Sequence, residues 1–140
     1  MNSELNLNEK CYQEIAQELN SMIPVKWQQI KLRAEIGEDS IGSYFYFLKE
    51  GETVFEPGDD IYRRYPVDRS TFKYSQVKIS RAVRALNNNF VSNGQEKWTT
   101  MTFTVDCKGH FKTDFEYINL DDSTEMGRRE EWEKKYLNIT

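Results

Sequence analysis

Two alternating runs near the end of the chain constrain its fold more than any other feature. Residues 98–105 and 111–117 each alternate in character, with Met101, Phe103 and Val105 in the first run and Phe111, Phe115 and Tyr117 in the second, and Asp106-Cys107-Lys108-Gly109 joins them. Such alternation is typical of strands with one buried face. Gly109 stands where a tight turn most easily adopts a positive φ. We therefore predict an antiparallel hairpin over these residues.

A second hairpin is predicted earlier in the chain. Residues 25–36 also alternate, with a change of phase at Gln28 and Gln29 that indicates a β-bulge. Residues 37–40 read as a tight connection, and the aromatic run at 44–48 is typical of a strand paired with the first. Residues 50–64 contain proline and glycine, which favour a loop with room for a short third strand.

Helical spacing of apolar residues marks two segments before the last hairpin. The first begins at Asn6, where Asn6 and Glu9 resemble a capping box, and Pro24 ends it. The second follows Asp68, which has the character of an N-cap, and it ends near the turn at residues 92–94.

A third helix is predicted after the last hairpin. Asp122 and Glu125 resemble another capping box at the start of this helix. The side chains expected to point inward from this helix are Met126, Trp132, Tyr136 and Leu137. The order helix, hairpin, loop, helix, hairpin, helix predicts an α+β fold: an antiparallel sheet of about four to five strands, covered on one face. The length of 140 residues fits a single domain, 1–140.

Composition narrows the class of protein. Nineteen Lys and Arg against 23 Asp and Glu give a net charge of −4, which argues against a general nucleic-acid binder. The first ten residues lack the basic and apolar regions of a signal peptide, and no apolar run is long enough to cross a bilayer. Cys11 and Cys107 have neither disulfide-scaffold nor zinc-site spacing. We expect a soluble cytoplasmic protein that makes no contact with membranes.

The sequence offers few groups for catalysis. His110 is the single histidine, and its separation of three residues from Cys107 is unlike a thiol dyad assembled from distant segments. Asp114 and Glu116 share a strand face and could serve in hydrolysis, but Lys112 lies on the same face, and a solvated surface explains all three. We expect a non-catalytic protein without a cofactor or metal.

Charge is unevenly distributed between two neighbouring segments. Residues 35–60 contain one base, Lys49, and eight acids: Glu35, Glu38, Asp39, Glu50, Glu52, Glu56, Asp59 and Asp60. A negative, loop-rich patch can bind a basic surface such as the nucleic-acid groove of a nuclease, although acidic loops also serve solubility alone.

The following segment, 63–84, is basic. Its one acidic residue is Asp68. Its basic residues are Arg63, Arg64, Arg69, Lys73, Lys78, Arg81 and Arg84. One hypothesis is a small nucleic-acid-binding regulator with Tyr62, Tyr65 or Tyr74 stacking on bases. The other is a charged helix surface that faces the acidic loop of its own domain.

Two motifs near the C-terminal end resemble a known family. Residues 109–117 read GHFKTDFEY and residues 128–137 read RREEWEKKYL, and both are similar to the end of the YezG-like immunity proteins. Residues 95–100, the first helix and the strand with Trp27 extend the resemblance over most of the chain. The chain departs from the pattern at residues 138–140, where a glycine is expected, and at 122–126, where a proline is expected.

This resemblance implies an antitoxin from a Gram-positive bacterium. It would bind the C-terminal toxin domain of a secreted polymorphic toxin, often a nuclease, and would carry no catalytic activity. In that setting Trp132 and Tyr136 are expected to be core anchors, and Arg128 to pair with a strand carboxylate such as Asp114. The acids considered for partner contact are Glu50, Glu52, Glu56, Asp59, Asp60, Asp114 and Glu116.

Overall fold

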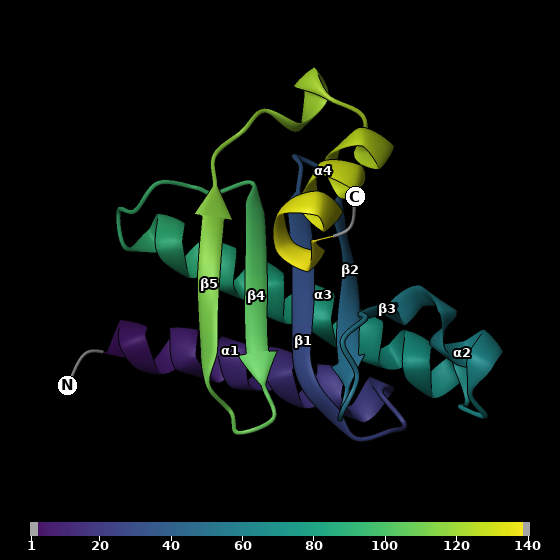
Figure 1. The fold of residues 1–140 in the computed structure, drawn as a ribbon. Helices are drawn as coiled ribbons and strands as arrows, with labels where there is room; N and C mark the ends of the chain where they lie inside the picture. Colours follow the sequence, from purple (N-terminus) through teal and green to yellow (C-terminus); the bar gives the residue numbers. More distant parts are fainter. Residues whose placement is uncertain (1–2, 139–140) are drawn as a thin grey trace.

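The computed structural model describes residues 3–138, with side chains from residue 7 onward, and it is built on one antiparallel sheet (Figure 1). Its strands are β1 (Trp27–Ile36), β2 (Ile41–Lys49), β3 (Glu56–Pro57), β4 (Thr100–Asp106) and β5 (Phe111–Glu116). They are ordered β3-β2-β1-β4-β5. Both predicted hairpins are confirmed, and the register shift between Trp27 and Gln29 is the predicted bulge.

The helices occupy both faces of this sheet. They are α1 (Ser3–Met22), α2 (Ile61–Arg64), α3 (Arg69–Ser92) and α4 (Glu125–Leu137). In Figure 1, α1 and α3 run behind the strands and cross them at a steep angle, whereas α4 lies in front of β1 and β2. The predicted α+β class is therefore confirmed, but the expectation that one face alone is covered is wrong. No helix in the described part of the chain is long and apolar enough to cross a membrane.

The main core lies between the sheet and the pair α1 and α3. Every second residue of each central strand points into it, and facing side chains of the two helices fill the space. The strand residues are Ile30, Leu32, Ala34, Ile36, Phe45, Phe47, Met101, Phe103 and Val105, and the helix residues include Ile15, Leu19, Ile79, Val83 and Leu86. Complete burial of one such side chain contributes about 1.5–3 kcal/mol relative to leaving it in water.

A smaller cluster lies on the opposite face, beneath α4. Trp132 and Leu137 are buried there against Tyr46 of β2, and Tyr44 and Tyr136 pack beside them. Trp132 is confirmed as an anchor, and Tyr136 lies half-buried at its side. Met126 was expected to point inward, but its side chain is 74% exposed. It lies in the first turn of α4, before the helix reaches the aromatic cluster.

The start of each helix tests the predicted caps. Asp68 caps α3 as predicted, accepting hydrogen bonds from the Ser70 amide and the Thr71 hydroxyl. The cap of α4 is Thr124, whose Oγ1 accepts from the Gly127 amide at 3.0 Å. Asp122 belongs instead to a short 3-10 turn, so its predicted capping role is wrong. Helix α1 begins by Ser3, so a cap at Asn6 is also wrong.

Candidate partner-binding surfaces

A chain of charged groups fastens α4 to the sheet. Arg33 on β1 is 5% exposed, and its Nη1 lies 2.8 Å from Oε1 of Glu116 on β5. Its Nη2 lies 3.5 Å from Glu35, and Glu35 also accepts two hydrogen bonds of 3.0 Å from Arg128 of α4. The Arg128 partner is thus a strand carboxylate as predicted, but it is Glu35 and not Asp114. Buried ions are stable in such a site only when they are paired.

Glu116 is held in its ionised form by this chain of charges. Its carboxylate accepts hydrogen bonds from Arg33 at 2.8 Å and from the Thr100 hydroxyl at 3.0 Å. Burial alone would raise the pKa of Glu116, but these hydrogen bonds and the charge of Arg33 outweigh burial and lower it. Asp114, two residues earlier, is exposed and accepts a hydrogen bond from the Tyr136 hydroxyl at 3.1 Å.

The acidic segment 50–60 divides into internal and exposed groups. Glu56 is 9% exposed and lies 3.0 Å from Lys49 Nζ and 3.0 Å from Arg64 Nη1. Asp59 lies 3.2 Å from Arg129 of α4, and Asp60 lies 3.9 Å from Arg63. These pairs show that part of the acidic segment faces cations of the same chain.

Glu50 and Glu52 differ from those acids. Both are exposed, and neither side chain forms an ion pair with any residue in the range 7–138 that the structure describes. Their carboxylates are therefore free to meet a cationic surface.

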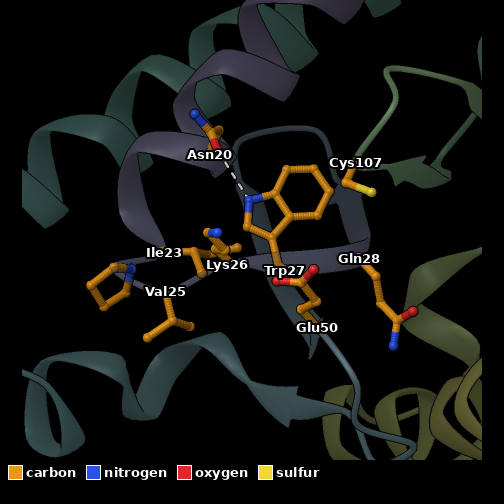
Figure 2. Close-up of a pocket in the computed structure, with 9 residues that line it drawn as sticks. Asn20, Ile23, Val25, Lys26, Trp27, Gln28, Glu50 and Cys107 are labelled. Atoms are coloured by element: carbon orange, nitrogen blue, oxygen red, sulfur yellow. Dashed lines mark hydrogen bonds between the residues drawn. The ribbon is translucent and has the colours of Figure 1, made fainter.

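Glu50 stands at the rim of an apolar depression at one end of the sheet. Figure 2 shows Trp27 at its centre, with Asn20 and Ile23 on one side and Cys107 of the β4–β5 turn on the other. The Trp27 Nε1 donates to Asn20 Oδ1 at 3.0 Å, which fixes the orientation of the indole ring. The depression has a volume of about 580 Å³. A half-buried tryptophan in a hollow is the kind of residue that anchors protein interfaces.

A second acidic group lies at the opposite end of the sheet. A cavity of about 1040 Å³ is lined there by Glu38, Asp121 and Glu125, together with Lys97 and Arg128. The predicted acidic segment included Glu38. The predicted segment did not include Asp121 or Glu125, because both lie more than 80 residues after Glu38 in the sequence. The pattern around them indicated the capped start of a helix instead.

The basic segment 63–84 lies on α2 and on the outer side of α3. Arg64 pairs with Glu56, and Lys78 lies 3.7 Å from Glu18 of α1. The α2 part of the segment therefore faces the acidic loop, as one of the two hypotheses held, whereas Lys78 of α3 pairs with α1 instead. Lys73, Arg81 and Arg84 instead line a shallow surface with Ile41 and Val77.

The cysteine and histidine of the last turn do not form a dyad. His110 Nδ1 lies 3.1 Å from Asp106 Oδ2, and the Asp106 carboxylate also accepts from the amides of Lys108 and His110. Among the described residues, Cys107 has no hydrogen bond with His110, and its free thiol lies beside Trp27 instead. These residues therefore shape a turn.

Comparison with known proteins identifies the family. The model of the family "Immunity protein YezG-like" matches residues 8–140. Proteins called immunity protein YezG are similar to this chain over 130 residues: that of Bacillus subtilis (strain 168) is 32% identical, covering 91% of this chain and 86% of the relative, and that of Bacillus spizizenii is 31% identical, covering 91% and 81%. The type VII secretion system protein EsaG of Staphylococcus aureus is 26% identical over 132 residues, covering 93% of this chain and 81% of the relative. The chain belongs to the YezG-like family of immunity proteins.

Proposed function

We propose that this chain is a cytoplasmic antitoxin that binds and neutralises the C-terminal toxin domain of a secreted polymorphic toxin. The observation that carries this proposal is the family match across residues 8–140. The name of the Staphylococcus aureus relative points to the type VII secretion system as the export route of the toxin. Neutralisation by direct binding would protect the producing cell before export.

We further propose that the toxin domain is a nuclease with a basic substrate groove. Support comes from the net charge of −4 and from the exposed carboxylates of Glu50 and Glu52. A negative surface raises the rate of encounter with a positive groove and competes there with nucleic acid. Asp59, Asp60 and Asp114 carry further exposed or half-exposed carboxylates, although Asp59 and Asp60 lie near Arg129 and Arg63 of the same chain. Glu56, by contrast, is occupied by Lys49 and Arg64 within the chain.

The Trp27 depression gives this surface an apolar anchor point. Glu50 and the indole of Trp27 line the same hollow, so a toxin side chain with an apolar stem and a cationic end could contact both. Interfaces commonly draw most of their binding energy from a few such central residues, while surrounding charges set the rate of association. We therefore assign the first contact to Glu50, Glu52 and Trp27.

Co-purification with the toxin domain encoded beside this chain tests the proposal. A stable complex is expected, and a failure of the two proteins to bind would contradict the antitoxin role. Association kinetics then test the contact. Glu50→Lys should slow association most at low salt, whereas Glu14→Lys makes the same charge change on the outer face of α1 and should have little effect. Equal rates for the two variants would exclude Glu50 from the contact.

A further inference from the structure

The strand β5 forms one edge of the sheet, and its outer side is open. The strand order ends at β5, and no strand among the described residues 3–138 pairs with its outer side. The pairing with β4 determines which backbone groups point outward. The Asp106 amide donates to the His110 carbonyl at 2.9 Å, so His110 is hydrogen-bonded to β4. Hydrogen-bonded and non-hydrogen-bonded residue pairs alternate along an antiparallel ladder, so the next residue of β5 has its amide and carbonyl turned away from β4. The amides and carbonyls of Phe111, Thr113 and Phe115 are therefore directed to the open edge.

The helix behind this edge continues past it. Tyr12 of α1 lies over β5, with its ring centroid 5.0 Å from that of Phe111, and Leu7 precedes it by five residues. Five helical residues span about 7.5 Å, whereas neighbouring strands are about 4.8 Å apart. In Figure 1 both α1 and the end of α3 extend beyond β5. The helix layer thus has room for one more strand than the sheet supplies.

The elements that border this position carry exposed apolar side chains. Leu7 of α1 and Val91 of α3 are each 49% exposed, and Phe111 at the start of β5 is 46% exposed. Tyr117, directly after β5, is 51% exposed. We call Leu7, Val91 and Phe111 the β5 shelf. An added strand would cover the shelf with every second side chain, as buried strands do elsewhere in this sheet.

We propose that an extended segment of the toxin domain adds to β5 as a sixth strand and covers the β5 shelf. This inference rests on the proposed function and names the structural element of the toxin that is bound. Asp114 and Lys112 are both exposed on the face of β5 away from the shelf, so the added segment carries a Lys or Arg beside Asp114 and an Asp or Glu beside Lys112. The β4–β5 turn, which contains Cys107, joins this edge to the Trp27 depression.

A second copy of the chain fits this position less well than a bare segment. Two copies joined edge to edge through β5 by a two-fold axis would carry their helices on the same face of the continuous sheet. The ends of α1 and α3 extend past β5 in each copy and would then meet. A single extended segment has no helix layer of its own and avoids this conflict.

Amide hydrogen exchange, with and without a saturating amount of the toxin domain, tests strand addition. The amides of Phe111, Thr113 and Phe115 should slow by at least about tenfold in the complex, whereas those of Lys112 and Asp114, already bonded to β4, should change little. If the complex forms and the outward amides are unaffected, strand addition is wrong while the antitoxin role stands. If no complex forms, both fail. If exchange of these outward amides in the free chain slows as the concentration of the chain rises, a second copy occupies the edge, and the proposal is overturned.

A pair of variants at Thr113 tests the same edge through affinity. Thr113→Pro removes the outward amide, a change that edge strands tolerate, and it should weaken toxin binding by about tenfold. Thr113→Val keeps the amide and removes the same hydroxyl, so its affinity should stay near that of the parent chain. Equal affinities of the two variants for the toxin domain would contradict the proposal. If the proline variant does not fold, the amide exchange experiment tests the proposal without it.

Discussion

Arg128 of α4 holds Glu35 of β1 through two hydrogen bonds of 3.0 Å, from Nε to Oε2 and from Nη2 to Oε1. The same guanidinium donates to the carbonyls of Leu120 and Ser123, so one side chain joins the loop before α4, the helix and the sheet. Two parallel N–H donors that bind the two oxygens of one carboxylate are a property of the planar guanidinium group of arginine. The docking of α4 therefore depends on directed polar contacts as well as on its small aromatic cluster.

Replacing Arg128 with lysine should lower the free energy of unfolding by about 2 kcal/mol. An ammonium group keeps the charge but cannot supply the two-point contact with Glu35, whose side chain is 11% exposed. Urea unfolding followed by circular dichroism measures the change. Arg84→Lys, on the exposed side of α3, is the matched control and should stay within about 0.5 kcal/mol of the parent chain. Equal unfolding midpoints for the two variants would refute this role of Arg128.

Truncating Trp132 should be more damaging than any other change on α4. Its indole is 3% exposed, contacts Tyr44, Tyr46 and Tyr136, and donates from Nε1 to the Thr102 hydroxyl at 2.9 Å. Trp132→Ala should cost about 3–5 kcal/mol through the cavity it leaves. Met126→Ala, on the same helix but exposed, should cost less than about 0.5 kcal/mol. Similar losses from both variants would mean that α4 does not pack as described.

The placement of α4 also marks the limit of what the sequence could predict. Period-two and helical spacing located both hairpins and all the long helices, because those patterns record which side chains face the main core. The polar residues of β5, Glu116 among them, gave the pattern of a solvated face, and Glu35 was counted in the acidic segment. In the structure Arg33 pairs with both Glu35 and Glu116, and Glu35 also pairs with Arg128 of α4. Charge partners more than 80 residues apart leave no local signal.

The candidate contact residues show the same limit. The acidic segment was visible from composition, but sequence could not distinguish exposed Glu50 and Glu52 from Glu56, which lies between Lys49 and Arg64. It also gave no sign of the Trp27 depression, whose walls come from α1, β1, the end of β2 and the β4–β5 turn. The expectation of a non-catalytic protein, by contrast, is confirmed by membership of an immunity-protein family.

Acid should weaken the contribution of Glu116 to stability. Its pKa is held below the ordinary value of 4.5 in the folded chain. Its stabilising contribution is therefore complete above about pH 4.5 and is lost as the pH falls through the lower folded pKa. Unfolding free energies of the parent chain and Glu116→Gln should differ at pH 7 and converge as the solution is acidified. A difference between the two proteins that stays constant with pH would contradict the pairing of Glu116 with Arg33.

The two cysteines should react very differently with Ellman's reagent. Cys107 is exposed, whereas Cys11 is 8% exposed and burial raises the pKa of its thiol. One thiol should react quickly in the folded chain, and the second only after denaturation. Cys107→Ser should abolish the fast phase and Cys11→Ser should leave it unchanged. A fast phase of two thiols would show that α1 does not cover the core as described.

The antitoxin role is tested most directly by titrating the toxin domain with this chain in a plasmid-cleavage assay. Cleavage should fall in proportion to the chain added and should stop once a fixed ratio of the two proteins is reached. Full cleavage in the presence of excess chain, with both proteins folded and the complex formed, would contradict neutralisation of a nuclease by direct binding.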